Sequence, residues 1–326
     1  MDTQRSGALA AVTGASGFIG EALVLHLLAA GRRVRALYRA PGAVSERLRL
    51  LGCEEVIGDL ANERALEALA DGADEVYHCA ATLAKTDKEL SRQTNVAGTE
   101  RMARAALTAG VRRILYVSSG SVYAASRRAD NTYVESVEPE HTAGLNNYSR
   151  TKWEGECVIR RLAETDGLHF TIIRPTNVYG LRSKPWFRQW EGLLARVPVA
   201  FGRVPLDFVY VKDVVAAFVA AAASPAAENR VFNVGHEMIP MRQFVAEVGR
   251  VIGRRARMLP DAIDHGVCVA ADRGFRIVTG SQISPSLVRP AYFPQASARA
   301  AFGYRPQYRL VDAMAEMARE YRPPAA

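Results

Sequence analysis

Three glycines that follow the first apolar run constrain the fold of this chain more than any other feature. Residues 8–12 form the apolar run, and a segment with helical periodicity covers residues 18–30. Gly14 and Gly17 lie between these two segments, and Gly20 lies near the start of the second. At a strand-to-helix turn, this spacing allows a tight turn, a close approach of the backbone to a pyrophosphate and close packing of the helix on the strand. The helix N-terminus offers unpaired N–H groups to the same anion. The alternative interpretation of the three glycines is an ordinary glycine-rich turn that binds no phosphate.

Strand and helix patterns alternate along the first half of the chain, and this alternation predicts the fold class. Further apolar segments with the length of buried strands, each followed by a helix pattern, cover residues 34–38, 55–57, 75–79, 113–117 and 169–173. The pattern predicts an α/β fold with a doubly wound parallel sheet (Rossmann fold), whose ligands bind outside the carboxyl ends of the strands.

The pattern loosens after Gly180, where prolines divide the chain into shorter pieces. We predict a dinucleotide-binding Rossmann domain over residues 1–180, a smaller α/β substrate-binding subdomain over residues 181–322, and a disordered tail over residues 323–326. The two parts are expected to pack as one unit, with some segments crossing between them. In the second part we expect helices over residues 214–223, 241–253 and 310–321, the first of them capped by Asp213.

Composition narrows the possible function classes. The net charge of +8 comes largely from scattered arginine pairs rather than from a basic block with interleaved aromatic residues, so we expect no nucleic-acid partner. The four cysteines and six histidines show no metal-ligand spacing, so we expect no metal. The longest wholly apolar run, residues 214–223, is too short to cross a bilayer. These features predict a cytoplasmic protein that binds a small-molecule substrate and could form a homodimer.

Strand ends in the first half carry residues suited to an adenine nucleotide. Arg39 follows the second strand, where a carboxylate would accept from the ribose 2′-OH of NAD and an arginine would instead hold a 2′-phosphate. We therefore predict NADP(H) as the preferred cofactor, with NAD(H) possible; a surface arginine without a role is the alternative. Asp59, followed by Leu60, could accept from the adenine amino group. A floor of small residues follows the fourth strand, at Ala80, Ala81 and Thr82.

A serine cluster and a helix carry the candidate catalytic groups. Serines stand within residues 118–121, after the fifth strand, and Tyr148 and Lys152 lie one helical turn apart in a helix that we expect to reach about Glu164. The ammonium favours phenolate, which predicts a tyrosine pKa below its usual value of about 10. Such a tyrosine exchanges a proton with an alcohol or carbonyl oxygen, and a serine hydroxyl stabilises charge on that oxygen. We expect His78 to be a packed or hydrogen-bonded strand residue rather than a catalyst.

With these motifs in this order, the chain resembles an extended short-chain dehydrogenase/reductase of the NAD(P)-dependent epimerase/dehydratase family. In character it is similar to the branch of 3β-hydroxysteroid dehydrogenases and dihydroflavonol reductases. The likeness extends from about residue 9 to about residue 306. The motifs that carry it are Thr13-Gly14-x-x-Gly17-x-x-Gly20, Gly58-Asp59-Leu60, Asn95-Val96-x-Gly98-Thr99, Ser118-Ser119-x-Ser121-Val122-Tyr123, Tyr148-x-x-x-Lys152, Arg174-Pro175-x-Asn177-Val178-Tyr179-Gly180 and Phe208-Val209-Tyr210-Val211-x-Asp213.

The resemblance implies roles for individual residues. Ser119 would be the active serine, Tyr148 the proton donor or acceptor, and Lys152 would also hydrogen-bond the nicotinamide ribose. Asn95 would support the site, with a helix cap as the alternative of nearly equal weight. The residues expected at the cofactor are Gly14, Ser16, Gly17, Phe18, Ile19, Gly20, Arg39, Asp59, Leu60, Ala80, Ala81, Thr82, Asn95, Tyr148, Lys152, Pro175, Asn177 and Val178. Those expected at the substrate are Ser121, Tyr123, Asn177 and Trp186.

Three departures from the family's motifs narrow the reaction. Gly120 and Ser121 stand where sugar-nucleotide dehydratases carry the Asp-Glu pair that eliminates water. Leu206 stands where nucleotide-sugar epimerases usually carry an arginine for the substrate diphosphate. Residues 294–300 lack the family's late Asp-x-Ser/Thr-Lys-Ala pattern. Dehydration is therefore not expected, and support for a sugar-nucleotide site is weak.

The three departures from the family's motifs, together with the aromatic residues in the second part of the chain, favour one function over the others. We predict an NADP(H)-dependent oxidoreductase that transfers hydride to or from the carbonyl or alcohol of a small apolar substrate. One alternative is a nucleotide-sugar epimerase or 4-ketoreductase, in which Arg203 or Arg289 would bind the substrate diphosphate in place of the arginine that is missing at position 206. Another alternative is a non-catalytic dinucleotide-sensing protein. The aromatic residues could instead form the core of the subdomain, and they are Trp186, Phe187, Trp190 and Phe201.

Overall fold

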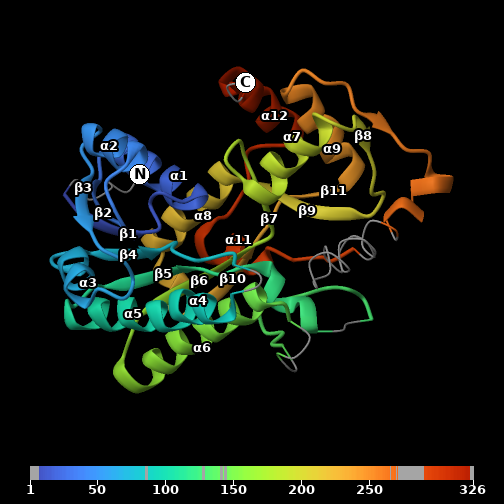
Figure 1. The fold of residues 1–326 in the computed structure, drawn as a ribbon. Helices are drawn as coiled ribbons and strands as arrows, with labels where there is room; N and C mark the ends of the chain where they lie inside the picture. Colours follow the sequence, from blue (N-terminus) through green and yellow to red (C-terminus); the bar gives the residue numbers. More distant parts are fainter. Residues whose placement is uncertain are drawn as a thin grey trace.

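The computed structural model describes residues 7–84, 87–126, 129–139, 142, 145–264, 266–268, 270 and 290–323. Within these residues, the central feature is a sheet of seven parallel strands in the order β10-β6-β5-β4-β1-β2-β3 (Figure 1). Its strands are β1 (Leu9–Thr13), β2 (Arg33–Tyr38), β3 (Glu54–Ile57), β4 (Glu75–His78), β5 (Arg113–Val117), β6 (Phe170–Pro175) and β10 (Arg230–Val234). The predicted α/β fold with a doubly wound parallel sheet is confirmed.

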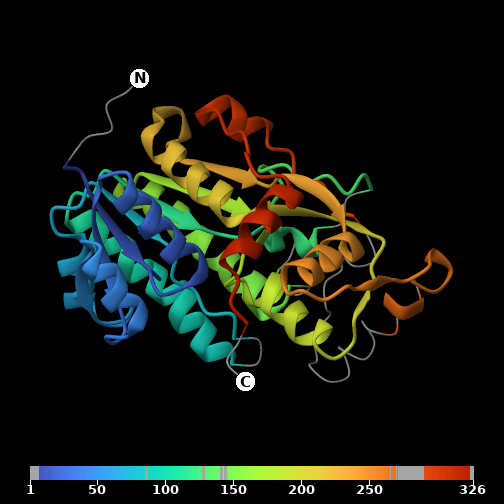
Figure 2. The same ribbon diagram turned by 90° about the horizontal axis from the view of Figure 1, so that it is seen from above.

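Helices cover both faces of this sheet, because its strands are apolar on both sides. One face is covered by α1 (Phe18–Ala29), α2 (Ala43–Leu50), α8 (Val211–Ala223) and α11 (Ala296–Phe302). The opposite face is covered by α3 (Glu63–Ala70), α5 (Gly98–Thr108) and α6 (Asn147–Asp166). Seen from above, α1 and α8 lie side by side over the sheet (Figure 2). Each layer therefore has its own apolar core.

The strand order reverses beside β1, and this reversal places the ligand site. From β1 the chain adds β2 and β3 on one side, and it then returns to add β4, β5 and β6 on the other. A crevice forms at such a switch point, outside the carboxyl ends of the strands. The segments that follow β1, β4, β5 and β6 therefore meet at one edge of the sheet.

A smaller sheet begins two residues after β6 ends. Among the described residues it contains β7 (Asn177–Tyr179), β9 (Pro205–Tyr210) and β11 (Glu237–Pro240), in the order β11-β9-β7. Its apolar core is shared with α7 (Gln189–Leu194), α9 (Met241–Val251) and α12 (Leu310–Glu320), and β8 (Val199–Ala200) pairs with β12 (Arg257–Met258) at its margin. β10 follows β9 in sequence yet joins the large sheet, so the chain passes between the two sheets more than once. The domain division at residue 180 stays a prediction.

The predicted helices are found within a few residues of their expected ends, but the predicted role of Asp213 is wrong. α8 begins at Val211, so Asp213 lies inside its first turn instead of before it. The Asp213 carboxylate accepts from the N–H groups of Gln307, at 2.7 Å, and Tyr308, at 3.2 Å. It therefore ties the segment before α12 to the start of α8.

Some predictions fall beyond the residues that the structure describes. Arg289 and residues 324–326 of the tail belong to this group. Among the helices in the described ranges, none combines the length and apolar character that a bilayer crossing requires. The described part of the chain also brings together no group of three His, Cys, Asp or Glu residues that could hold a metal ion.

Candidate active site

The loop between β1 and α1 has a shape that requires glycine. Gly14 has a φ of +72°, and a Cβ added there would lie 2.6 Å from the backbone nitrogen of Ala80. A Cβ on Gly20 would lie 2.2 Å from the carbonyl oxygen of Gly14. Gly17 donates its N–H to the same carbonyl at 2.8 Å. The strand, the loop and the helix are therefore as close as their backbones allow, which is what a tight phosphate-binding turn needs.

The start of α1 is suited to binding an anion. The helix begins at Phe18, and Gly17 before it has no side chain with which to cap the helix. The first N–H groups of a helix have no partner inside it, so those of Phe18 and Ile19 are available to a ligand. Ser16 and Gly17 are exposed, so a ligand can reach the loop. These features fit the pyrophosphate of a dinucleotide.

An arginine that no sequence motif marks lies beside this loop. Arg182, which follows β7, donates to the carbonyl oxygen of Ser16 at 3.3 Å and forms an ion pair with Glu21 of α1. Arg47 of α2 binds the same carboxylate, which is almost fully buried. The second part of the chain thus places a cation at the entrance of the phosphate-binding loop. The contact joins residues far apart in the sequence, so no local pattern could have predicted it.

A chain of hydrogen bonds fixes the floor of small residues after β4. Thr13 Oγ1 lies 2.7 Å from His78 Nδ1, and His78 Nε2 lies 3.0 Å from Thr99 Oγ1. The N–H of Ala80 donates to Thr13 Oγ1 at 3.2 Å. Burial, and to a smaller extent the charge of Lys152, lowers the pKa of His78 to about 3, so its imidazole is neutral. His78 is a hydrogen-bonded strand residue, as predicted.

Asn95 joins this floor to the helix that carries Tyr148. Its Oδ1 accepts from the N–H of Thr82 at 2.8 Å, and its Nδ2 donates to the Thr82 carbonyl at 3.1 Å and to Thr151 Oγ1 at 2.9 Å. Asn95 is fully buried in the middle of a π-helical turn, so the alternative of a helix cap is wrong. Its amide instead fixes the backbone of Thr82 relative to α6.

The residues predicted at the adenosine lie at the ends of β2 and β3. Arg39 is exposed and forms no ion pair with any residue that the structure describes. Asp59 is also exposed, and its Oδ1 accepts from the N–H groups of Ala61, at 2.9 Å, and Asn62, at 3.1 Å. The side chain of Leu60 is part of the core, so only its backbone is available to a nucleotide.

Ser119, Tyr148 and Lys152 lie around the carboxyl end of β5. Ser119 Oγ accepts from the N–H of Ser121 at 3.1 Å, and the Ser119 hydroxyl is near enough to the half-buried Tyr148, in the first turn of α6, to lower the pKa of its phenol. Lys152, one turn further along the helix, is 1% exposed, and its Nζ lies 4.0 Å from the centre of the Tyr116 ring. The structure thus brings the three predicted catalytic residues to one place.

Burial dominates the protonation of the tyrosine and the lysine. It raises the pKa of Tyr148 to about 12, against a hydrogen bond with Ser119 that lowers it. It lowers the pKa of Lys152 to about 7, against the charge of Glu156, which raises it. The prediction of a tyrosine pKa below 10 is therefore wrong, because desolvation outweighs the lowering effect of Ser119 on the phenol. Tyr148 keeps its proton at neutral pH, as a proton donor must.

A buried ion pair lies next to these groups and binds Tyr123, a residue predicted to touch the substrate. Arg174 donates through Nε and Nη2 to the carboxylate of Glu156, at 2.9 and 2.6 Å, and both side chains are fully buried. Arg174 Nη1 also donates to the Tyr123 hydroxyl at 2.7 Å, and that hydroxyl donates to Asn233 Oδ1 at 2.9 Å. Tyr123 is 1% exposed and its hydroxyl is engaged in the interior, so the predicted substrate contact finds no support in its position. Its polar end has two partners in the interior.

The segment expected beside the nicotinamide follows β6. Pro175 is the buried last residue of β6, and Val178 is partly buried against the core. Asn177 is half-buried, and its Nδ2 donates to the carbonyl oxygen of Asp207 at 2.8 Å. This amide holds β7 to β9, so the segment is rigid where it passes the carboxyl end of the large sheet.

The aromatic residues of the second part form a core. Trp186 packs edge-on against Phe208 and Phe244, with ring centres 5.2 and 6.4 Å apart. Phe187 is fully buried, and Trp190 is 8% exposed. The alternative of a subdomain core is therefore confirmed, and the half-buried Trp186 is committed to it.

Two side chains near Ser119 lie outside the predicted catalytic group. Ser121 Oγ is buried, and the described residues offer it no hydrogen-bond partner. Phe293, in the segment before α11, packs over Gly120, where an added Cβ would lie 3.5 Å from its ring. Its ring centre also lies 5.8 Å from those of Tyr123 and Tyr133. The sequence could not reveal Phe293, because its contact with the serine loop joins distant parts of the chain.

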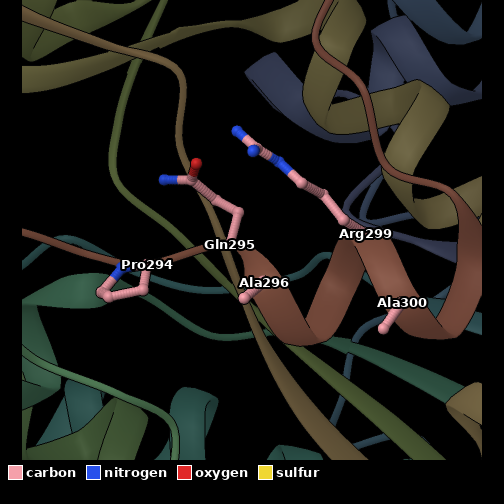
Figure 3. A pocket seen from close by; sticks show the side chains of 5 residues that line it. All are labelled: Pro294, Gln295, Ala296, Arg299 and Ala300. Atoms are coloured by element: carbon pink, nitrogen blue, oxygen red, sulfur yellow. The ribbon is translucent and has the colours of Figure 1, made fainter.

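Two hollows among the described residues lie outside the predicted site. One, of about 620 Å³, opens beside the start of α11, where Gln295 and Arg299 extend to the same side (Figure 3). It is lined by Pro294, Gln295, Ala296, Arg299 and Ala300. The other, of about 720 Å³, lies between the end of α6, the start of β10 and the segment 134–138. No predicted site residue lines either hollow, so we place the candidate active site at the strand ends.

The fold and the residues at its strand ends define a dinucleotide-binding protein of the Rossmann type. Residues 10–235 match the model of the NAD dependent epimerase/dehydratase family, and the chain belongs to this family. The predicted family is thereby confirmed. The protein is an NAD(P)-dependent enzyme of the extended short-chain dehydrogenase/reductase type.

The names of its relatives refer to different substrates. The chain is 29% identical to a 3-beta-hydroxysteroid dehydrogenase of Mycolicibacterium neoaurum, over 94% of this chain and 89% of that protein. It is 35% identical to a UDP-glucose 4-epimerase of Mycolicibacterium smegmatis, over 69% of this chain and 76% of that protein. Among solved structures, MoeE5 in complex with UDP-glucuronic acid and NAD matches 96% of this chain and 99% of its own, with a TM-score of 0.74 and 24% identity. These likenesses establish the family and the fold, but not the substrate.

Proposed function

We propose that this protein is an oxidoreductase that transfers hydride between NADP(H) and the carbonyl or alcohol of a small apolar substrate. Ser119, Tyr148 and Lys152 form its catalytic group. The observation that carries the proposal is that Ser119 lies beside the Tyr148 phenol, next to a buried Lys152. A phenol that keeps its proton at neutral pH and lies beside a serine hydroxyl is suited to give that proton to a substrate oxygen.

The chain's own residues handle the proton and the charge on the substrate oxygen. In the reducing direction, the nicotinamide supplies hydride to the carbonyl carbon when it is bound. As negative charge develops on the oxygen, Ser119 donates a hydrogen bond to it and Tyr148 transfers its phenolic proton. Lys152, in its ammonium form, stabilises the phenolate that remains and holds the nicotinamide ribose. In the oxidising direction, the same groups remove the proton of the alcohol.

The preference for NADP(H) rests on Arg39. Its guanidinium is exposed at the end of β2 and has no ion-pair partner among the described residues, so it is available to a 2′-phosphate. Asp59, the nearest candidate for the adenine, lies at the end of the neighbouring strand. NAD remains the alternative cofactor, because MoeE5, which shares the fold, is in complex with NAD.

The apolar substrate is supported by two positions. Phe293 packs against the residue that follows Ser119, so an aromatic ring borders the reacting atoms. Leu206, which replaces the usual diphosphate-binding arginine, is 2% exposed in the core of the small sheet. The relative named 3-beta-hydroxysteroid dehydrogenase agrees with an apolar ketone or alcohol. The relative named UDP-glucose 4-epimerase favours a second candidate, in which the exposed Arg203 would take the place of the missing clamp.

Turnover measurements on matched variants test the proposal. Purified protein is offered steroid and flavonoid ketones with NADPH, and UDP-sugars in parallel. Tyr148→Phe deletes the proton donor and keeps the ring, so turnover should fall by roughly 10²–10⁴ with little change in NADPH affinity. The control is Tyr308→Phe, because Tyr308 is also half-buried and its hydroxyl binds no described residue.

Each outcome points to one of the candidate functions. A folded Tyr148→Phe protein with full activity refutes the mechanism. Interconversion of UDP-sugars without net NADPH consumption favours the epimerase. NADPH binding without turnover of any substrate offered favours the dinucleotide sensor.

A further inference from the structure

We propose that Glu156 is a positioning residue for this reaction, which acts through the serine loop and keeps Lys152 charged. The inference rests on the function proposed above. Glu156 lies four residues after Lys152 and eight after Tyr148, so the three side chains share one face of α6. The carboxylate does not touch the reacting atoms, and its influence passes through its neighbours.

Glu156 ties together the segments that carry the site. Its Oε1 accepts from the Ser118 hydroxyl and from Arg174 Nε, the latter at 2.9 Å, and its Oε2 accepts from Arg174 Nη2 at 2.6 Å. Ser118 directly precedes Ser119, and Arg174 directly precedes Pro175. One buried carboxylate thus fixes the end of β5 and the end of β6 relative to the helix that carries Lys152. A bidentate pair of this kind is geometrically specific.

The same ion pair is connected to three further parts of the chain. Arg174 Nη1 donates to the Tyr123 hydroxyl and to the carbonyl oxygen of Glu135, at 2.7 and 3.3 Å. The Tyr123 hydroxyl donates in turn to Asn233 of β10. Replacing a buried ion pair by apolar groups is often neutral or stabilising, so stability alone does not require this pair. A role in the chemistry of the neighbouring lysine accounts for it.

The charge on Glu156 acts on Lys152 in surroundings that are otherwise neutral or repulsive. The titratable groups that face Lys152 are His78 and Cys79 of β4, Tyr116 of β5, and Tyr148 and Glu156 of α6. Those that face Glu156 are Arg174 of β6, Tyr116, Tyr123, and Cys157 and Arg160 of α6. Burial keeps His78, Cys79, Tyr116 and Tyr148 uncharged at neutral pH. Among these groups, Glu156 supplies the negative charge that favours the ammonium form of Lys152.

The titration of Lys152 can be measured directly, without turnover. The chain has five lysines, so ¹³Cε-lysine labelling of the cofactor-free protein gives few NMR signals, and Lys152→Met assigns the one of interest. In the wild type the midpoint should lie near pH 7. Glu156→Gln keeps the shape and removes the charge, so the midpoint should fall by about one pH unit. The matched control is Glu154→Gln, which makes the same substitution on the same helix outside the ion pair.

A second variant guards against loss of folding. Glu156→Gln leaves the Arg174 charge buried without its partner, whereas Glu156→Gln/Arg174→Met removes both charges at similar volume. A lower midpoint in folded Glu156→Gln, but not in Glu154→Gln, supports the inference, and the folded double variant, which also loses the Arg174 cation, should show a smaller fall; an unchanged midpoint in both variants overturns it. A wild type that binds NADPH but shows no turnover would contradict the proposed function and would leave the titration result standing.

Discussion

Replacing Gly20 by alanine should open the phosphate-binding loop while the protein stays folded. A Cβ at this position would lie 2.2 Å from the carbonyl oxygen of Gly14 and 2.7 Å from its carbonyl carbon. Ordinary contacts of this kind are about 1 Å longer, so α1 or the loop must move by about that distance. The Gly14 backbone cannot yield, because it is itself packed against Ala80.

The size of the effect follows from that displacement. Overpacking of a core by one methyl group costs about 1–3 kcal/mol, and alanine recovers up to about 1 kcal/mol because it is a better helix former than glycine. The net loss of stability is therefore about 3 kcal/mol or less, which a protein of this size tolerates. A shift of about 1 Å in a binding group can cost about 10²-fold, so NADPH affinity should fall by roughly that factor.

Fluorescence titration with NADPH and a thermal melt measure the two effects separately. Gly192→Ala is the matched control, because Gly192 is a helix residue of α7 with ordinary backbone angles, and an added Cβ would meet nothing within 4 Å. It should leave the NADPH affinity unchanged. Wild-type affinity in the Gly20→Ala protein would refute the reasoning that links the glycine spacing to the phosphate.

Further predictions concern the cofactor, the substrate and the pH dependence of stability. Arg39→Asp should weaken NADPH far more than NADH in a titration, because it replaces a cation by a repelling anion beside the 2′-phosphate; equal losses would contradict the assignment. UDP and dTDP should not raise the melting temperature, because Leu206 stands where epimerases usually carry the arginine that binds the substrate diphosphate. Clear stabilisation by either nucleotide would favour the epimerase. Burial raises the pKa of Asp207 from 3.8 to about 7. Between these two pH values the folded state binds more protons than the unfolded state, so the free energy of unfolding falls as the pH rises. Asp207→Asn cannot ionise and should gain a few kcal/mol relative to the wild type between about pH 4 and pH 8 in urea unfolding, whereas a constant difference would contradict the raised pKa.

The sequence predicts those parts of the fold and site that depend on local spacing. The glycines at 14, 17 and 20 must lie at the start of a helix, and the i, i+4 spacing of Tyr148 and Lys152 puts both on one helix face. The position of Ser119 after an apolar strand brings it to the carboxyl edge of the sheet. These inferences need only helix and strand geometry, and the structure brings the residues together as expected.

The missed features depend on burial and on contacts between distant segments. Tyr123 stands in the serine motif, but its hydroxyl is taken by Arg174, which follows about fifty residues later and shows no local sign of being buried. Tyr148 and Lys152 have shifted pKa values because water is excluded around them, and the amount of exclusion is a property of the whole fold. Asp213 resembles a helix cap in sequence, yet its partners lie more than ninety residues away.

The site combines two kinds of segment that can change independently. The groups that we propose to handle the proton stand just after β5 and on α6, and the hydrogen bonds that the buried Glu156 accepts join α6 to the end of β5 and to β6. The side chains that we propose to border the substrate come from elsewhere: Ser121 from the turn after β5, and Phe293 from the segment before α11. Phe293 packs against the ring of Tyr123, whose hydroxyl accepts from Arg174, so a different residue there would act on Glu156 only through these two side chains. A shared proton-handling group with a separately built substrate wall explains how relatives of this fold can carry names as different as a steroid dehydrogenase and a sugar epimerase.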